Sequence, residues 1–286
     1  MGGKMSVEQT REFHFTTQDF QLISKLIYQR AGISLSESKQ ELVYSRVARR
    51  LRATGIKTFA EYLDRLQRGD AAEWEEFTNS LTTNLTSFFR EAHHFHVLTD
   101  HLRMLGKARP IELWCSACST GEEAYTMAMT AVDAFASFDN PVRIVASDLD
   151  TKVLEAARIG RYRLESVARM PAHQIDKFFV RGKGEDAGFV QVRPELQKMI
   201  IFRRVNLLDI VWPIREKLDA IFCRNVMIYF DKATQLAVLK KFAPLLRSDG
   251  LLFAGHSENF YHADAYFKLR ANTVYELAAK SKTASG

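Results

Sequence analysis

Two adjacent glutamates and an aspartate stand where a nucleoside-binding fold would place its ligand groups. An apolar run, Ile111–Trp114, leads into a turn of small residues that is followed by Glu122 and Glu123. A second apolar run, 142–146, is followed by Asp148. An acid at the tip of the second strand of a strand–turn–helix–strand unit usually binds ribose hydroxyls. This spacing predicts a nucleoside site.

The same two glutamates argue against a ligand that carries phosphate groups. They occupy the start of the predicted helix, where a dinucleotide would place its pyrophosphate. A carboxylate about 5 Å from a phosphate charge costs roughly 3 kcal/mol at an effective dielectric constant of 20. S-adenosylmethionine has an adenosine, a sulfonium and an ammonium but no phosphate, so the acids favour it. Only Gly121 of the three glycines of a nucleotide-binding turn is present, and a turn with solvated acids is the alternative.

A third group of polar residues follows another apolar run, Ile221–Cys223. Arg224 and Asn225 come directly after this run, and Tyr229 lies close behind them. Ligands of open α/β sheets bind outside the carboxyl ends of the strands. We therefore expect these side chains at the same pocket as the acids, although polar residues at a strand end can also cap the next helix.

The cysteines and histidines do not suggest a metal site. Cys115 and Cys118 form a C-x-x-C pair, but no second pair completes a zinc site, and small residues suit a tight turn beside a ligand. His93, His94 and His96 have a spacing that cannot easily bring all three onto one metal ion. We assign them to a linker helix and expect no metal.

The composition indicates a soluble, cytoplasmic protein. The chain has 286 residues, 47% of them hydrophobic, enough for one large core or two modest ones. No apolar run approaches the roughly 18 residues of a membrane span, and no signal peptide is visible. The three cysteines are too few for a disulfide framework, which suits a reducing compartment. We predict a monomer that is not inserted into a membrane.

The pattern of apolar residues changes near residue 90. Residues 17–80 show helical spacing throughout, whereas β-rich runs alternate with helical ones after residue 110. This predicts an α/β protein: a Rossmann-like doubly wound domain with a small helical N-terminal domain and an inserted antiparallel β-subdomain. The expected ranges are 1–83 for the helical domain, 84–98 for a linker, 99–280 for the doubly wound domain, 160–196 for the insertion and 281–286 for a disordered tail. The expected strands of the main sheet are 111–114, 142–146, 199–205, 218–223, 251–254 and 273–277.

One predicted helix of the first domain is strongly basic. Residues 25–52 contain seven basic and two acidic residues, a surplus of five, while the whole chain carries a net charge of +6. Val43, Val47 and Leu51 form an apolar stripe, and the arginines lie broadly opposite. The basic face suits an acidic protein better than nucleic acid, because no aromatic residues for base stacking lie between the arginines. A merely solvated face is the alternative.

A predicted hairpin lies inside the crossover between two strands. Apolar runs flank a loop with three glycines, Gly182, Gly184 and Gly188, between Phe178 and Val192. A small projecting hairpin has a free edge, and such an edge can capture an extended peptide by strand addition. A decorative insertion without this role is the alternative.

The chain resembles the chemotaxis receptor methyltransferase family, the S-adenosylmethionine-dependent enzymes that methylate glutamates of bacterial chemoreceptors. The resemblance covers nearly the whole chain in order. One departure is Ala124, where the family commonly has proline after the paired glutamates. The matching segments are 83–90 (TNLTSFFR), 119–123 (STGEE), 146–148 (ASD), 205–208 (VNLL), 222–229 (FCRNVMIY) and 253–258 (FAGHSE).

The resemblance implies a set of cofactor-binding residues. Asn84, Thr86 and Arg90 would reach the methionine part of S-adenosylmethionine from the linker. Glu123 and Asp148 would hold the amino group and the ribose region. The adenosine would be framed by Asn206, Leu207, Arg224 and Asn225.

The resemblance also implies how a receptor is bound. The basic helix would dock the receptor's methylation helices through Arg46, Arg49 and Arg50. The hairpin, with Arg181, Gly182, Gly184 and Gly188, would bind a pentapeptide at the receptor's C-terminus. The strength of that capture is open, because Gln191 stands where related hairpins can carry a basic side chain.

The implied chemistry needs no general base. A receptor glutamate with a pKa near 4.3 is already ionised at neutral pH, so its oxygen can attack the methyl group of the sulfonium directly. The enzyme would align the reacting atoms and exclude water. Arg90 would anchor the carboxylate of the cofactor, and Tyr229 would orient the incoming glutamate. The rival functions are a nucleic acid methyltransferase and a non-catalytic scaffold that binds receptors through the hairpin.

Overall fold

The computed structural model of the protein describes residues 11–278. The chain divides into two compact units on either side of the Thr82–Thr83 peptide bond. The tail predicted at 281–286 lies outside the described residues. None of the described helices is long and apolar enough to cross a membrane.

The first unit is built from helices, as predicted. Thr16 begins the first helix with a capping box that includes Asp19. Val43, Val47 and Leu51, the predicted apolar stripe, are fully buried and hold the second helix against its neighbours. The elements are α1 (Thr17–Ala31), a 3₁₀ turn η1 (Glu37–Lys39), α2 (Gln40–Thr54), α3 (Phe59–Gln67) and α4 (Ala71–Leu81).

The second unit contains a seven-stranded sheet in the order β6-β2-β1-β7-β8-β10-β9. The five strands from β6 to β8 are parallel, and β10 runs antiparallel to both β8 and β9. This is the doubly wound topology that the sequence predicts. The strands are β1 (Ile111–Cys115), β2 (Val142–Asp148), β6 (Ile200–Arg204), β7 (Leu218–Cys223), β8 (Leu246–Ala254), β9 (Phe267–Ala271) and β10 (Val274–Leu277).

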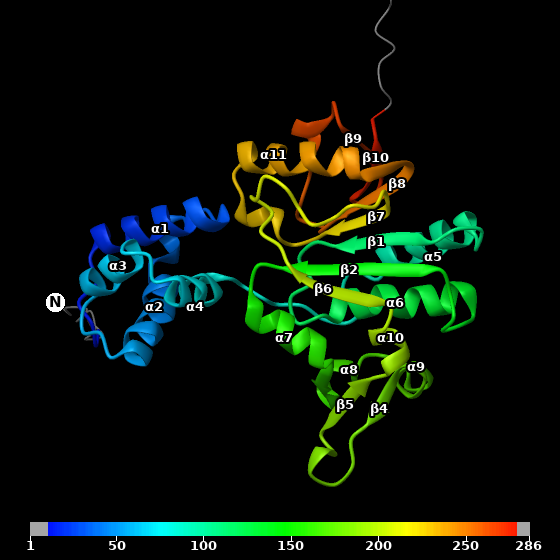
Figure 1. Ribbon diagram of the computed structural model, residues 1–286, viewed down its shortest axis with the longest axis horizontal. Coiled ribbons are helices and arrows are strands. Elements are labelled where there is room, and N and C mark those ends of the chain that lie inside the picture. The colour runs from blue at the N-terminus through cyan, green and yellow to red at the C-terminus, as the bar shows by residue number, and fades with distance from the viewer. Residues whose placement is uncertain (1–10, 279–286) are drawn as a thin grey trace, which may run out of the picture. The chain divides into compact units, whose positions relative to one another are not determined.

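Helices cover the two faces of this sheet and create two hydrophobic cores. Helices α5, α6 and α7 pack with Leu113 and Ile144 on one face. Helix α11 packs with Trp114 and Ile221 on the other face, and Figure 1 shows it beside β7 and β8. The helical elements around the sheet are α5 (His93–Leu105), α6 (Glu122–Phe135), α7 (Thr151–Ile159), η3 (Met227–Tyr229), α11 (Lys232–Phe242), η4 (Ala243–Leu245) and η5 (Tyr261–Ala263).

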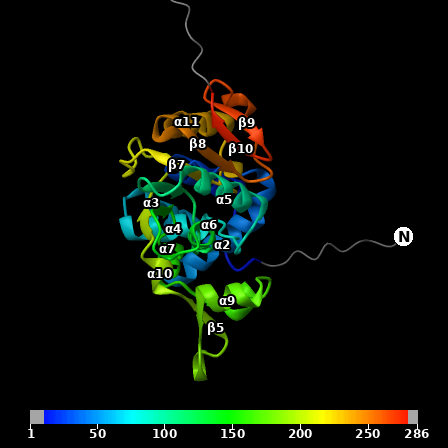
Figure 2. The same ribbon diagram turned by 90° about the vertical axis from the view of Figure 1, so that its right-hand side faces the viewer.

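A small antiparallel β-subdomain is inserted between α7 and β6, which confirms the predicted insertion. Its three strands lie in the order β3-β5-β4, with the predicted hairpin formed by β4 and β5. Figures 1 and 2 place it at the end of the unit opposite to α11. Its elements are β3 (Arg161–Arg163), α8 (Leu164–Val167), α9 (Ala172–Phe178), β4 (Phe179–Arg181), η2 (Gly184–Asp186), β5 (Phe189–Val192) and α10 (Pro194–Gln197).

Some elements differ from the prediction. Strand β9 was not predicted, because only Phe267 of its five residues is buried and no apolar alternation marks it. Strand β3 was missed for the same reason, since Tyr162 is its one buried residue. Strand β8 begins at Leu246 rather than Leu251. Helix α5 begins at His93, inside the expected 84–98 linker.

Candidate functional site

The carboxyl ends of three parallel strands bring the predicted ligand groups to one edge of the sheet. Strands β1 and β2 pair in parallel, and β1 also pairs in parallel with β7. Glu123 follows the turn after β1, Asp148 ends β2, and Arg224 and Asn225 follow β7 directly. The structure therefore brings together three groups of residues that lie far apart in the chain.

Asp148 organises the turn after β1. One of its carboxylate oxygens accepts the backbone N–H of Ser119 at 2.8 Å, and the other accepts the N–H of Asp150 at 3.0 Å. Burial raises the pKa of Asp148 to about 6, and these two hydrogen bonds oppose the rise. A carboxylate held in this way is ready to accept further hydroxyl groups.

Asn84 is fixed at the tip of β2 by contacts on both sides. Its side-chain amide donates to the Asp150 carboxylate at 2.8 Å, and its carbonyl accepts the Ser119 hydroxyl at 2.9 Å. Asp150 also caps α7 through the N–H of Lys152 at 2.9 Å. The structure thus gives Asp150 a supporting role that the sequence did not indicate. Thr86, another predicted cofactor residue, is half-buried and lies two residues beyond Asn84.

Arg224 forms the centre of a buried acidic cluster. Its guanidinium lies 3.0 Å from the Glu123 carboxylate and 3.3 Å from the Glu91 carboxylate. The thiol of Cys115 donates to the other Glu123 oxygen at 3.2 Å. Arg224 also donates to the carbonyl of Arg90. Two carboxylates contact one guanidinium here, an arrangement that suits a ligand with a positive charge.

The two carboxylates of this cluster respond differently to it. Burial raises the pKa of Glu123, and the charge of Arg224 opposes the rise. Burial also works to raise the pKa of Glu91, but Arg224, His256 and Asn225 together lower it below its usual value. Glu91 is therefore the firmly ionised partner of Arg224.

Sequence reasoning missed Glu91, although it follows Arg90 directly. The Asn225 side-chain amide donates to Glu91 at 3.4 Å, and a ring nitrogen of His256 lies 3.3 Å from it. His94 lies three residues on, 3.6 Å away, but Arg224, Asn225 and His256 come from segments more than a hundred residues away, and no local pattern could reveal them. The available signal was that Glu91 directly follows Arg90, which ends the matching segment 83–90.

Left-handed backbone conformations are concentrated at this edge of the sheet. Phe89, Glu91, Ser119 and Asn225 have φ values of 53°, 56°, 49° and 57°, although none of them is glycine. Such conformations are uncommon for residues with a side chain and persist where the surroundings hold them. They identify the turns around Arg90, Glu123 and Arg224 as strained.

Glu258 holds the turn after β7. Its buried carboxylate accepts the backbone N–H groups of Gly255 at 2.6 Å, Asn225 at 3.0 Å and Ile228 at 3.3 Å. A Cβ atom on Gly255 would lie 2.4 Å from the Asn225 side-chain nitrogen. The matched segment 253–258 therefore supports the Arg224–Asn225 turn, a role that the sequence did not indicate.

Arg90 and Tyr229, the predicted catalytic residues, are both half-buried. The Arg90 guanidinium donates to the carbonyl of Leu85 at 2.8 Å. The Tyr229 hydroxyl makes no hydrogen bond within the described part of the chain. Tyr229 ends the 3₁₀ turn η3, close behind Asn225, so its hydroxyl is available to a ligand.

Asn206 and Leu207 begin a braced loop after β6. The Asn206 side chain accepts the N–H of Leu208 at 3.0 Å, and its carbonyl accepts the indole N–H of Trp212 at 3.1 Å. The ammonium of Lys241 donates to the carbonyls of Leu207 and Asp209 at 2.9 and 2.7 Å. These contacts fix the loop that was predicted to frame the adenosine.

Two family models match almost all of the chain. Residues 84–275 match the domain described as CheR methyltransferase, SAM binding domain. Residues 18–82 match the domain described as CheR methyltransferase, all-alpha domain. The chain belongs to the CheR methyltransferase family.

Curated relatives agree with this assignment over nearly their full lengths. Chemotaxis protein methyltransferase 2 of Pseudomonas aeruginosa is 52% identical over 94% of this chain and 96% of its own. The chemotaxis protein methyltransferase of Escherichia coli K12 is 48% identical over 95% of each chain. The predicted family and the predicted cofactor, S-adenosylmethionine, are thereby confirmed: this CheR-family chain is a methyltransferase of chemotaxis.

The structure separates the three arginines that were expected on the docking face of α2. Arg46 donates to the carbonyls of Leu81 and Thr82 at 2.9 and 2.7 Å. Arg50 pairs with Glu73 and Glu76, each at 2.9 Å, and is largely buried. Arg49 is exposed, and within residues 11–278 it donates only to its own helix, at the carbonyl of Ser45.

The hairpin residues of this CheR-family chain have distinct structural roles. A Cβ atom on Gly182 would lie 2.0 Å from the carbonyl oxygen of Asp186, and Gly184 has φ 60°. Gly188 has open space around it. Arg181 is exposed and pairs with Asp176 at 3.1 Å, and the side chain of half-buried Gln191 donates to the carbonyl of Ile159.

The described residues contain no group of histidine, cysteine and acidic side chains that could hold a metal ion. His94 is buried, and burial lowers its pKa to about 4. Cys115, Cys118 and Cys223 are free and buried, and burial raises the pKa of their thiols. These thiols are therefore protonated and shielded from solvent.

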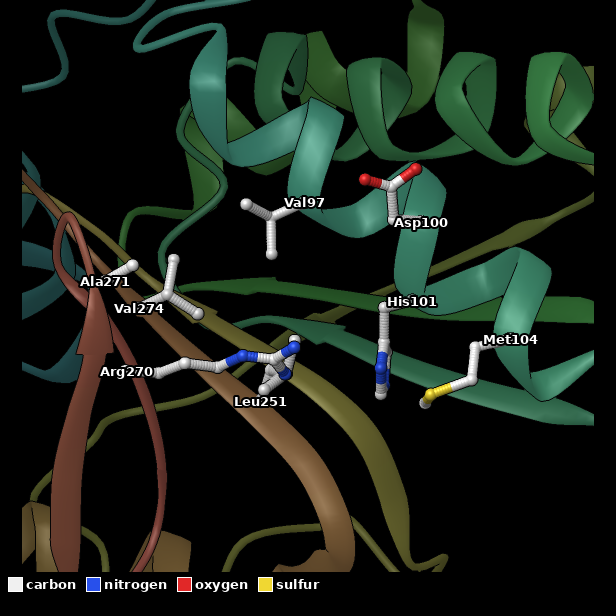
Figure 3. Close-up of a pocket in the computed structure, with 8 residues that line it drawn as sticks. All are labelled: Val97, Asp100, His101, Met104, Leu251, Arg270, Ala271 and Val274. Carbon is white, nitrogen blue, oxygen red and sulfur yellow. The ribbon is translucent and has the colours of Figure 1, made fainter.

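A cavity of about 280 Å³ lies between α5 and strands β8–β10, as Figure 3 shows. It includes none of the cofactor-binding candidates, and we assign it no role. Its lining residues are Val97, Asp100, His101, Met104, Leu251, Arg270, Ala271 and Val274.

Proposed function

We propose that the protein transfers a methyl group from S-adenosylmethionine to glutamate side chains of chemoreceptors, giving glutamyl methyl esters in sensory adaptation. The observation that carries the proposal is the buried cluster of Glu91, Arg224 and Glu123 beside Asp148. Its carboxylates complement a ligand with a sulfonium and an ammonium and disfavour one with phosphates. Charge and hydrogen-bonding groups therefore fit the cofactor.

The cofactor-binding residues divide into two groups in this proposal. Arg90 anchors the carboxylate of the cofactor's methionine part, with Asn84 and Thr86 beside it. Glu123 holds the amino group. Asp148 accepts the ribose hydroxyls, and the adenosine is framed by Asn206, Leu207, Arg224 and Asn225. The bound cofactor would supply an electrophilic methyl group; the bond from carbon to sulfur breaks as the bond to the glutamate oxygen forms, which leaves S-adenosylhomocysteine as the product.

The chain's own residues position the acceptor glutamate and need not remove a proton from it. The free glutamate carboxylate is ionised at neutral pH. Tyr229, whose hydroxyl has no partner within residues 11–278, donates a hydrogen bond that orients the acceptor. The strained turns keep these groups in place, which supports catalysis by alignment and exclusion of water.

Receptor binding is proposed at two further places. The exposed guanidinium of Arg49 on α2 meets acidic residues of the receptor. Arg46 and Arg50 were expected to share this role. Their guanidinium groups contact Leu81 and Glu73, respectively, and so fix α2 within the first unit. The hairpin 178–192 binds the receptor's C-terminal pentapeptide along the free edge of β4, since β5 occupies only its other edge. The protein acts as a cytoplasmic monomer.

The chemistry is tested by transferring radiolabelled methyl groups to a purified chemoreceptor cytoplasmic fragment. Glutamyl esters release volatile methanol in mild alkali, whereas methylated amines and nucleic acid bases do not. We expect alkali-labile label that disappears when the acceptor glutamates of the fragment are replaced by alanine. Alkali-stable label, or equal labelling of RNA, would refute glutamate esterification.

The tether is tested separately by calorimetric titration with a receptor C-terminal pentapeptide and with its scrambled version. Saturable binding of the first alone supports the tether. Equal or absent binding of both would remove the tether while leaving the methyl transfer intact.

A further inference from the structure

One half of one sheet face lacks the helix that a doubly wound fold normally places there. Parallel strands are ordinarily covered on both faces. Helices α5, α6 and α7 cover one face, and α11 covers the other only beside β7 and β8 (Figure 1). The crossover from β6 to β7, residues 205–217, is fully described and contains no helix. The crossover segment itself packs against Trp114 and Val145, and it leaves Arg143 of β2 and Ile201 and Arg203 of β6 exposed.

The residues on this exposed area follow from strand alternation. Ile200 and Phe202 pack into the core under α6, so Ile201 and Arg203 point to the opposite face. Ile201 is in register with Val145 on β2, and it is 54% exposed. Val145 is half-buried. Arg143 lies on the same face two residues before Val145.

The crossover loop adds two exposed apolar side chains at its tip. Ile210 is 93% exposed and Val211 is 79% exposed. The loop is nevertheless firmly held. The rings of Trp212 and Trp114 pack with their centroids 5.1 Å apart, and the ammonium of Lys241 donates to two backbone carbonyls of the loop. A braced loop that presents adjacent apolar side chains to solvent is typical of an interaction surface.

We define the β2–β6 face as Arg143, Val145, Ile201 and Arg203 together with the loop residues Ile210 and Val211. Its apolar ridge is flanked by positive charge. The Arg143 guanidinium is 3.7 Å from Glu112 and 70% exposed. The Arg203 side chain is exposed and makes no hydrogen bond or ion pair among residues 11–278. A complementary surface must therefore offer carboxylates beside apolar groups.

The spacing of these groups matches a helix. Residues two apart on a strand are separated by roughly 6.6 Å, and neighbouring strands by about 4.8 Å. Side chains three or four apart on a helix are separated by about 5–6 Å. An added strand would pair with the backbone edge of β6 and leave Arg143 and Val145 uncovered. Nucleic acid would gain little from Ile201 and Ile210, because stacking needs aromatic residues.

We propose that the β2–β6 face docks an amphipathic α-helix of a partner protein, with acidic residues one turn away from an apolar ridge. The partner's helix lies on the part of this face that the crossover loop leaves exposed. The apolar ridge contacts Val145, Ile201 and the loop tip, and the carboxylates pair with Arg143 and Arg203. This surface is separate from the acidic cofactor cluster, so the proposal does not depend on which side chain is methylated.

The test titrates the full-length protein, labelled at isoleucine methyl groups, with a synthetic helix that carries a leucine ridge flanked by glutamates. A matched helix has lysine at every glutamate position. We expect the Ile201 and Ile210 signals to shift with the glutamate helix, and at least about tenfold weaker binding of the lysine helix. The double variant Ile201→Glu, Arg203→Glu should lose about tenfold or more in affinity.

A matched control lies on the opposite edge strand. Leu269 on β9 is 46% exposed and is followed by exposed Arg270. The double variant Leu269→Glu, Arg270→Glu should bind the glutamate helix as the unaltered protein does. Both variants should keep the melting temperature and the affinity for S-adenosylhomocysteine, which separates a lost surface from a lost fold.

Three results would overturn the proposal. Equal binding of the two helices would show that the face does not recognise the charge of its partner. Signal shifts at isoleucines other than Ile201 and Ile210 would place the binding site elsewhere. Self-association of the protein that Ile201→Glu abolishes would assign the face to a second copy of the chain.

Discussion

The guanidinium of Arg224 lies between the carboxylates of Glu91 and Glu123, so its removal should damage both stability and cofactor binding. Breaking a buried ion pair from one side typically costs about 3–5 kcal/mol. We expect Arg224→Ala to lower the melting temperature markedly and to abolish binding of S-adenosylhomocysteine in calorimetry. Arg224→Lys should be intermediate, because an ammonium cannot reproduce the guanidinium fork.

The control for this prediction is Arg169→Ala. Arg169 is exposed and makes no ion pair among the described residues, and such changes usually alter stability by less than about 0.5 kcal/mol. Normal stability of Arg224→Ala would show that the cluster is less tightly coupled than its distances indicate.

Asp148 should make cofactor binding depend on pH. Its pKa is raised to about 6 by burial, and only the ionised carboxylate accepts hydroxyl groups with both oxygens. Affinity for S-adenosylhomocysteine should therefore fall by up to about tenfold per pH unit as the pH drops below 6. Asp148→Asn should weaken binding by roughly 10- to 100-fold at neutral pH and remove this dependence.

Exposed Asp139→Asn provides the comparison, because it should keep both the affinity and the pH profile. If the affinity of Asp148→Asn for S-adenosylhomocysteine still falls below pH 6, another acid of the site causes the pH dependence.

At the scale of residues, sequence reasoning identified groups that follow strands but missed their supports. Asp148 and Arg224 could be predicted because each stands directly behind an apolar run. Glu91, Asp150 and Glu258 could not be given roles, because each acts through hydrogen bonds to residues in distant segments. The ligand groups were visible in local patterns, whereas the network holding them exists only in the folded chain.

The hairpin of the β-subdomain should tolerate a methyl group at one glycine and not at another. Gly182→Ala would place Cβ 2.0 Å from a backbone oxygen, so the loop must shift, which typically costs about 1–3 kcal/mol. We expect about a tenfold or greater loss of pentapeptide affinity with unchanged cofactor affinity. Gly188→Ala meets open space and should behave as the unaltered protein. Equal pentapeptide affinity of the two variants would show that the loop takes no part in peptide binding.

The basic helix α2 should contribute to receptor docking through its exposed arginine. Arg49→Glu should lower kcat/KM for receptor methylation by about two- to tenfold, more at low salt, without changing cofactor affinity. Lys57→Glu, an exposed charge reversal in the same unit, is the matched control. Equal losses in both variants would indicate a general charge effect instead of a defined docking face.

At the scale of elements, apolar periodicity predicted the helices of the first unit and most strands of the sheet. It worked because α2 is amphipathic and β7 is mostly apolar and fully buried, so both elements bury the residues that the pattern marks. It missed β9 and β3, each of which has a single buried residue, since exposed edge strands lack apolar alternation. Edge strands are specified by pairing with a neighbour, and pairing cannot be read from one segment.

For the whole molecule, the division at Thr82–Thr83 leads to a prediction about a fragment. Asn84, Thr86, Arg90, Asp148 and Arg224 all belong to the second unit. The fragment 83–286 should therefore fold and bind S-adenosylhomocysteine within about threefold of the full-length affinity, a difference below about 0.7 kcal/mol. Calorimetry on a fragment with a cooperative thermal transition checks this. A folded fragment without affinity would assign part of the cofactor site to the first unit.

The left-handed residues at the sheet edge have a consequence for how this enzyme can evolve. Each holds a conformation that costs on the order of 1 kcal/mol outside glycine, and the cost is carried by a fold that brings Phe89, Glu91, Ser119 and Asn225 to one place. Mutations that relax these turns would raise the free energy of unfolding and lower the turnover rate at the same time. Stability and turnover are therefore opposed at these four positions, and a screen for heat resistance alone would select against catalysis there.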